Sequence, residues 1–328
     1  MIRPPRCHVV TSSGAGTSVP TFPMASVAPG RHIAGYRVLA EIGKGAASEL
    51  YAVQDLKTKQ VWALKQVHKV TDKDQRFLDQ CEQEYIIGSK LDHPNIRRVV
   101  RLIKHRKFFR VTDYVLLMEL VDGLPLDQRL PRTSLAAVRI FRQMAQGLAH
   151  MHQRNWVHAD MKPSNVLVTE GGMAKIIDLG QSCPVGTIKK RIQGTPGYMA
   201  PEQAFRREIT PQTDIYNLGA TMYWVLVREV VPTAMPPKGK GSDSSNGSLV
   251  KGAVDESMIE RPVPPHEKNP RVHSVLSKLV LDCVELDPQK RPATMQHVID
   301  RLGIIEELMN APPPGAAAAS GASGDSTM

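Results

Sequence analysis

Five short motifs constrain this chain more than any other feature, because they occur in a fixed order and lie far apart in the sequence. They are Gly-Lys-Gly at 43–45, Ala-Leu-Lys at 63–65, His-Ala-Asp-Met-Lys-Pro-Ser-Asn at 158–165, Asp-Leu-Gly at 178–180 and Ala-Pro-Glu at 200–202. Any one of them can arise by chance, whereas the occurrence of all five in this order indicates that they form a single site. The fold must therefore bring widely separated segments together.

Length and composition leave room for two hydrophobic cores. The chain has 328 residues, of which 41% are hydrophobic and 23% are charged. Residues 1–30 and 309–328 are poor in large apolar side chains, so we expect a disordered leader and a disordered tail. The Pro- and Gly-rich stretch 232–270 interrupts helical patterns and is expected to be a surface insertion.

Periodicity divides the remainder into two units. Alternating apolar residues predict strands at 36–39, 48–53, 61–64 and 114–118. One helix interrupts them, capped by Thr71 with Asp74 and carrying apolar residues at helical spacing from Phe77 to Leu91. Helical patterns then cover 136–152, 213–227, 273–285 and 295–307. The prediction is an α+β, two-lobed fold, with a small antiparallel-sheet N-lobe plus one helix at 31–120, a larger mainly helical C-lobe at 121–308, and a nucleotide between them.

The glycine motif lies between two predicted strands, so it forms a hairpin rather than the strand-to-helix turn of a dinucleotide fold. Gly43 and Gly45 would let backbone N–H groups approach phosphates closely, and Ser48 takes the place of a third glycine. Alone, such a hairpin is a plain turn more often than a nucleotide site.

Lys65 ends the next strand, and Glu84 lies on the helix that follows it. A lone lysine on a strand is usually solvated. A buried ion pair with Glu84 would instead hold the ammonium against two phosphates.

The segment 157–168 is the most specific of the motifs. Asp160 could accept the proton of a substrate hydroxyl, and Lys162 would supply positive charge to phosphoryl oxygens. Asn165 and Asp178 offer hard oxygen ligands, so Mg²⁺ or Mn²⁺ is the expected metal. Loop capping would explain any one of these residues but not the set.

These motifs make residues 36–302 resemble a bacterial eukaryotic-type (Hanks-type) serine/threonine protein kinase. The resemblance implies ATP and Mg²⁺, and packing of His158 and Leu179 in a spine that joins the lobes. Lysine at position 162 is typical of transfer to serine or threonine. The implied adenine-binding residues are Leu50, Ala63, Met118 and Leu167, with the backbone of Glu119 and Val121.

The resemblance extends beyond the catalytic motifs. Residues 194–199 are similar to a substrate-docking loop, in which Thr195 would contact Asp160 and Lys162. Asp214 would anchor the backbone of the catalytic loop. Arg291 would pair with Glu202.

Three residues depart from the family pattern. Ala159 replaces the arginine before the candidate base, and Leu179 replaces a common phenylalanine. Gly88 is expected to leave a hole in the spine and to loosen the helix that carries Glu84.

Ala159 offers no charge to a phosphate on the activation loop. A phosphate on Ser182 or Thr187 would therefore lose its usual partner. The basic residues at 189–191 could substitute for it or face solvent, and we favour solvent. The sequence thus predicts a kinase that does not depend on activation-loop phosphorylation.

Charge and cysteine content bear on partners and compartment. The net charge is +10, and the densest basic cluster, at 97–110, is interpreted as a solvated face of a strand pair rather than a nucleic-acid site. Cys7, Cys81, Cys183 and Cys283 lack metal-ligand spacing, which indicates free thiols in a reducing cytoplasm. No apolar run is long enough to span a membrane. The expected partners are protein substrates.

Two other classes compete with an active protein kinase. An ATP-binding pseudokinase scaffold is disfavoured because the positions of Lys65, Glu84, Asp160, Asn165 and Asp178 are all filled. A small-molecule phosphotransferase shares the His-x-Asp signature, but the docking segment at 194–202 and Arg291 favour a protein substrate.

Overall fold

The computed structural model describes residues 30–45, 47–107, 110–234 and 259–311. Almost all of the predicted leader and tail, and residues 235–258 of the predicted insertion, lie outside these ranges. Within them, no helix is both long and apolar enough to cross a membrane.

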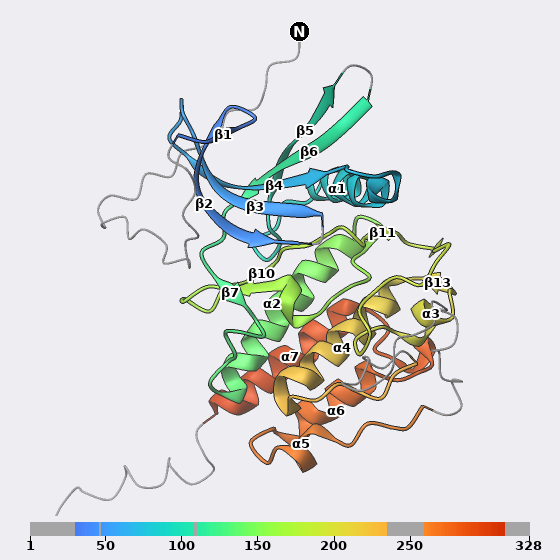
Figure 1. The fold of residues 1–328 in the computed structure, drawn as a ribbon. Coiled ribbons are helices and arrows are strands. Elements are labelled where there is room, and N and C mark those ends of the chain that lie inside the picture. The colour runs from blue at the N-terminus through green and yellow to red at the C-terminus, as the bar shows by residue number, and fades with distance from the viewer. Residues whose placement is uncertain (1–29, 46, 108–109, 235–258, 312–328) are drawn as a thin grey trace, which may run out of the picture.

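The N-lobe is a six-stranded antiparallel sheet with one helix against it (Figure 1). The strands lie in the order β1-β2-β3-β4-β6-β5. All four predicted strands are present and longer than predicted, and β5 and β6 form the strand pair expected under the basic cluster. The strands are β1 His32–Ile33, β2 Tyr36–Lys44, β3 Ser48–Asp55, β4 Val61–His68, β5 Val99–Lys107 and β6 Arg110–Glu119.

Helix α1 (Gln75–Gly88) follows a 3₁₀ turn at Asp72–Asp74. The Asp74 carboxylate accepts hydrogen bonds from the Thr71 backbone N–H at 2.7 Å and from Thr71 Oγ1 at 2.9 Å, which is the predicted cap. The prediction that the helix reaches Leu91 is wrong. The chain turns after Gly88, and buried Leu91 joins the core of the C-lobe instead.

The C-lobe is built from four long helices, of which α4 (Pro211–Val227) is the most deeply buried. They begin and end within a few residues of the predicted patterns, and α7 runs three residues beyond the predicted end at 307. Two short helices, α3 (Pro201–Ala204) and α5 (Pro265–Lys268), were not predicted. The long helices are α2 Ser134–His152, α4 Pro211–Val227, α6 Ser274–Cys283 and α7 Met295–Asn310.

The described ends of the stretch 232–270 are part of the packed lobe. Tyr223 Oη donates a hydrogen bond to the Val263 carbonyl at 3.1 Å, and Asn269 Nδ2 donates to the Leu226 carbonyl at 2.8 Å. Ala234 is fully buried. Any insertion that projects from the surface is therefore shorter than the predicted range.

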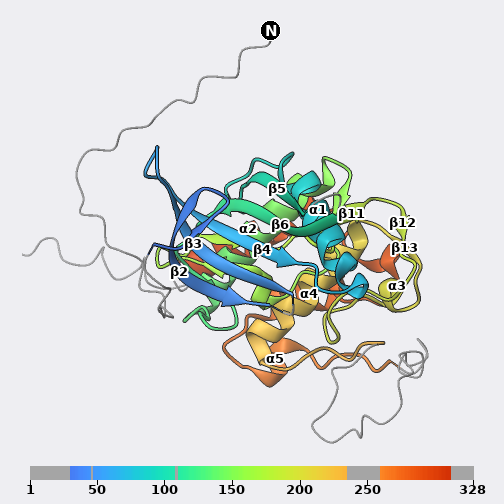
Figure 2. The ribbon, with the colours of Figure 1, turned by 45° about the horizontal axis from the view of Figure 1, so that its top comes forward.

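Short strands at the junction of the lobes position the motif-bearing loops. Strands β7 (Leu124–Pro125), β9 (Val166–Val168) and β10 (Ala174–Ile176) form one small sheet, in the order β10-β9-β7. Two further pairs are β8 (Trp156–Val157) with β11 (Cys183–Pro184), and β12 (Thr187–Ile188) with β13 (Glu208–Ile209). Figures 1 and 2 both show α1 beside the segment that contains β11. The loop after β8 leads to β9 and the loop after β10 leads to β11, so both loops connect the same two small sheets.

Candidate active site

Lys65 on β4 and Glu84 on α1 form an ion pair, with Lys65 Nζ at 2.7 Å from Glu84 Oε2. The Glu84 side chain is 1% exposed. Burial alone would lower the pKa of Lys65, but the carboxylates of Glu84 and Asp178 outweigh that effect and hold it above its usual value. The ammonium therefore stays charged at neutral pH, and the interpretation of Lys65 as a lone solvated lysine does not apply.

Asp160, Lys162 and Thr195 contact one another. Thr195 Oγ1 donates to Asp160 Oδ1 at 2.7 Å, and Lys162 Nζ donates to Thr195 Oγ1 at the same distance. Lys162 Nζ also lies 3.2 Å from Asp160 Oδ2. These contacts hold the Asp160 carboxylate in one orientation. The side chain is 11% exposed, so a hydroxyl group can still reach it.

Asn165 and Asp178 are held together through the backbone. The Ile177 N–H, one residue before Asp178, donates to the Asn165 carbonyl at 3.0 Å. The Asn165 amide nitrogen donates to the Asp160 carbonyl at 2.8 Å, which leaves the amide oxygen as its free ligand atom. Burial would raise the pKa of Asp178, but Lys65 and the Gly180 N–H hold it below its usual value. An ionised carboxylate and an amide oxygen are ligands that fit Mg²⁺.

Asp214 accepts three hydrogen bonds at the start of the loop that contains Asp160. They come from the backbone N–H groups of His158 and Ala159 and from His152 Nε2, each at 2.8 Å. The Asp214 side chain is fully buried, which by itself would raise its pKa, but His152 and the other donors lower it. The sequence interpretation included the backbone contacts and missed His152.

Gln203 connects the segment at 194–202 to the loop that contains Asp160, and sequence reasoning missed it. Its Nε2 donates to the Ala159 carbonyl at 2.7 Å, while its Oε1 accepts from Ala200 N at 3.0 Å and from Asn217 Nδ2 at 2.9 Å. A glutamine directly after Ala-Pro-Glu was the only signal available.

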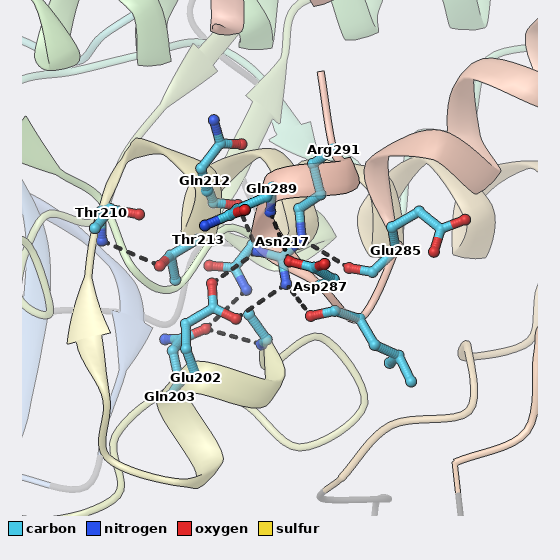
Figure 3. A network of polar contacts seen from close by, with 12 residues as sticks. Glu202, Gln203, Thr210, Gln212, Thr213, Asn217, Glu285, Asp287, Gln289 and Arg291 are labelled. Carbon is cyan, nitrogen blue, oxygen red and sulfur yellow. Dashed lines mark hydrogen bonds and ion pairs between the residues drawn. The ribbon is translucent and has the colours of Figure 1, made fainter. Parts of the chain in front are cut away.

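Figure 3 shows Glu202 and Arg291 at the centre of a buried polar network. Arg291 Nη1 and Nη2 lie 2.7 and 3.0 Å from the two carboxylate oxygens of Glu202. The remaining N–H groups of Arg291 donate to the carbonyls of Glu285, Gln212 and Leu286. All five guanidinium donors are thus used, which fixes α3 against the loop before α7.

The expected hole at Gly88 does not exist. A Cβ atom at position 88 would lie 2.4 Å from Val99 Cγ2 and 3.3 Å from Leu179 Cδ1. Val99, on β5, fills the space that a larger side chain on α1 would have occupied. Gly88 therefore permits close packing of α1, and the prediction that it loosens the helix is wrong.

The segment after Asp178 differs from its prediction at one basic residue. Lys189 is half-buried and donates to the Gln181 carbonyl at 2.5 Å, and burial lowers its pKa. Lys190 and Arg191 are exposed, as predicted. Ser182 is 3% exposed, and its hydroxyl points to the His158 carbonyl at 3.4 Å.

The predicted nucleotide-binding residues lie on both lobes. Gly43 pairs with Leu50 across the β2–β3 hairpin, and the Gly45 N–H closes that hairpin on the Ser48 carbonyl at 2.7 Å. Leu50, Ala63 and Met118 belong to one apolar cluster of the N-lobe. At the junction, Glu119 ends β6, Val121 is buried after it, and half-buried Leu167 lies on β9.

The basic cluster is not uniformly solvated. Arg97 is 8% exposed and pairs with Glu84 at 3.2 Å. Lys104 Nζ lies 2.5 Å from Glu82 Oε1, and the Arg98 guanidinium lies over the Trp62 ring. Arg101 and Arg106 are exposed. The solvated-face interpretation holds for the exposed members and is wrong for Arg97, because α1 places a carboxylate beside it.

Comparison with known proteins gives consistent matches over most of the chain. The protein kinase domain matches residues 36–302. The chain is 29% identical to the serine/threonine-protein kinase pkn3 of Myxococcus xanthus over 281 residues (80% of this chain, 48% of pkn3). It is 28% identical to PrkC of Bacillus subtilis over 276 residues (81% and 40%). It is also 30% identical to a mouse protein named inactive serine/threonine-protein kinase PLK5 over 269 residues (80% and 42%).

The chain spans less than half the length of these three relatives. The match nevertheless covers both lobes, including all five motifs and the Glu202–Arg291 pair. A two-lobed fold was predicted, and the family match and the sheet and helices described above confirm it. This chain belongs to the family of proteins with a protein kinase domain.

Proposed function

We propose that this chain is an ATP-dependent serine/threonine protein kinase, which transfers the γ-phosphoryl group of ATP to Ser or Thr hydroxyls of protein substrates. The observation that carries the proposal is the contact of Thr195 with both Asp160 and Lys162. Through it, the segment that resembles a substrate-docking loop is joined directly to the candidate base and its neighbouring cation.

The chain's own residues have distinct roles in this proposal. Asp160 orients the substrate hydroxyl and accepts its proton. Lys162 lies beside the same carboxylate and stabilises negative charge on the transferring phosphoryl oxygens. Lys65, kept charged by Glu84, positions the phosphates of the nucleotide.

The metal proposal rests on the ligand types present. Asn165 and Asp178 would hold Mg²⁺ or Mn²⁺, which neutralises charge on the phosphates when bound. In the described residues no cluster of three or more His, Cys, Asp or Glu side chains could hold a metal on its own. Phosphate oxygens and water would therefore complete the coordination, as is usual for magnesium at nucleotide sites.

We also propose that activity does not depend on phosphorylation of the activation segment. Ala159 lies in an apolar cluster with Val157, Cys183 and Ile209, at the place where an arginine would receive a phosphate. Ser182 is buried and would have to leave its site to be modified. Apolar packing thus replaces a phosphate-dependent contact.

A non-catalytic scaffold is the second candidate, since one relative is named an inactive kinase. The filled positions at Lys65, Asp160 and Asp178 favour catalysis over that reading. The test is incubation of the full chain with γ-labelled ATP, Mg²⁺ and a generic basic protein. We expect label on serine or threonine, and Asp160→Asn should lower turnover by roughly 10²–10⁴-fold with nucleotide binding retained.

Other outcomes would select the alternatives. Nucleotide binding without transfer would support the scaffold, and transfer only to small hydroxyl compounds would support a small-molecule phosphotransferase. Excess chelator should abolish the transfer if the metal proposal holds. The three described cysteines are buried free thiols, and the cytoplasmic location stays a prediction.

A further inference from the structure

Arg97 lies in the segment between α1 and β5, and its guanidinium contacts Glu84 and the chain just before Asp178. Its side chain is 9% exposed, and Nη2 lies 3.2 Å from Glu84 Oε1. The same Nη2 donates to the backbone carbonyl of Ile177, the residue before Asp178. The guanidinium thus joins the helix that carries Glu84 to the loop that carries Asp178.

Glu84 is therefore held by two cations rather than one. Lys65 pairs with Oε2 and Arg97 pairs with Oε1, so each carboxylate oxygen has its own partner. The two cations are held in place by different parts of the molecule. Lys65 lies on β4 of the N-lobe, whereas Arg97 is anchored to β10 of the C-lobe.

The anchoring of Arg97 to β10 is through the backbone. The Arg97 N–H donates to the Ile176 carbonyl at 2.8 Å, and the Ile176 N–H donates to the Asn95 carbonyl at 2.9 Å. Ile96 and Ile176 form a parallel bridge between these two bonds. The position of Arg97 is therefore set by the strand that leads directly to Asp178.

The burial of Arg97 is not explained by stability alone. Within the described residues its Nε is buried without a hydrogen-bond partner. A buried charged group with an unsatisfied donor tends to destabilise a fold relative to an apolar residue of similar volume. Such a residue is better explained by what it positions.

We infer that Arg97 is a positioning residue that locks α1 against the C-lobe, so that Glu84 and Lys65 are in place without a phosphate on the activation segment. This inference rests on the proposed kinase function. The lock joins Glu84 to the Ile177 carbonyl, so it needs no charged partner near Ser182 or Thr187, where Ala159 provides none.

The test compares Arg97→Met with Arg101→Met in the full chain. Arg101 is exposed on β5, four residues after Arg97, so its variant loses the same charge without touching Glu84. Hydrogen exchange of the α1 amides (Gln75–Gly88) should be at least about tenfold faster in Arg97→Met than in the wild type. Arg101→Met should match the wild type.

Kinetics separate positioning from a general structural effect. Arg97→Met should lower kcat by roughly 10- to 100-fold through misplacement of Lys65, with the KM for ATP changed less than about threefold. Arg97→Lys keeps a charge but not the fork of donors, and should give intermediate exchange and kcat. If Arg97→Met does not fold, the test uses Arg97→Lys instead. Its α1 exchange and its kcat are then compared with those of Arg101→Met and the wild type.

A further variant tests the independence of the two cations. In Lys65→Met, Arg97 still holds Glu84, so α1 should keep its slow exchange although transfer is lost. Equal α1 exchange in Arg97→Met and Arg101→Met, or a kcat of Arg97→Met within twofold of the wild type, would overturn the inference. Absence of transfer by the wild type would instead overturn the proposed function, and the exchange comparison is readable in either case.

Discussion

The side-chain amide of Gln203 donates a 2.7 Å hydrogen bond to the carbonyl oxygen of Ala159. Ala159 has a φ of 60°, in the left-handed region that non-glycine residues seldom occupy. Its N–H is held by Asp214 and its carbonyl by Gln203, so the strained turn before Asp160 is fixed on both sides. The direction of Asp160 therefore depends on two residues that are distant in sequence.

Gln203→Met should remove the clamp on the Ala159 carbonyl. It leaves Ala159 O and Ala200 N without this partner and Asn217 Nδ2 with only the Tyr198 carbonyl, and the expected loss is about 2–3 kcal/mol of unfolding free energy. Phosphoryl transfer should also slow, because Asp160 is less well oriented. Urea unfolding and initial rates measure the two effects. Gln296→Met, on an exposed face of α7, is the control, and equal behaviour of both variants would contradict the assignment.

Thr195→Val should lower kcat by roughly 10- to 100-fold, because it removes the hydroxyl between the charged groups of Asp160 and Lys162 while keeping the side-chain shape. Thr195→Ser retains the hydroxyl and should stay close to the wild-type rate. Steady-state kinetics with a protein substrate provide the measurement. A Val variant as active as the Ser variant would show that the bridge has no role.

Arg291→Met should destabilise the C-lobe by about 3–5 kcal/mol, because it leaves the carboxylate of Glu202 buried without a countercharge. Arg291→Lys should recover little, since a lysine cannot replace the five donors. The double variant Glu202→Met/Arg291→Met should be more stable than Arg291→Met alone. Denaturant unfolding measures the stability of the three variants. A double variant no more stable than Arg291→Met alone would contradict the prediction.

Ser182→Ala/Thr187→Ala should keep most of the initial rate of the wild type. Ser182 is buried beside the His158 carbonyl, and position 159 has no arginine that could bind a phosphate. Phosphatase-treated wild-type protein should behave in the same way. A rate drop of tenfold or more in the double variant, with an unchanged circular dichroism spectrum, would show that the segment needs phosphorylation.

Asp214 makes a pH-dependent contribution to stability. Its pKa in the folded state is lowered from the ordinary value of 3.8, because His152 and backbone N–H groups outweigh the effect of burial. The stabilisation is therefore present above the unfolded-state pKa and is lost as the pH falls through the lower folded-state pKa. The difference in unfolding free energy between wild type and Asp214→Asn should shrink as the pH falls below the ordinary value of 3.8. A difference that does not change below this value would argue against an ionised Asp214.

The motifs were sufficient to predict the residues whose partners are local in sequence or follow from the family resemblance. Asp160, Lys162 and Asn165 lie within one loop, and their contacts follow from its short length. Alternation and helical spacing likewise located the long strands and helices. The described ends of 232–270 were misread because composition alone cannot show that α5 packs against α4 and α6.

The residues missed from sequence are those whose partners come from another element. His152 reaches Asp214 across 62 positions, and Gln203 reaches Ala159 across 44. Arg97 looked like one member of a basic face, because nothing in its neighbourhood of the sequence shows that Glu84 faces it. Such contacts depend on the packing of helices and strands, which periodicity does not encode.

The contact between Gly88 and Val99 has a consequence for how this chain can change. The space between α1 and β5 is filled from the strand side, so the two positions share a single volume. Enlarging residue 88 alone would push α1, with its ion pair, away from the sheet, whereas a simultaneous reduction at 99 would compensate. We therefore expect a larger residue at 88 to occur with a smaller residue at 99, so that the side-chain volume between α1 and β5 and the placement of the helix stay the same.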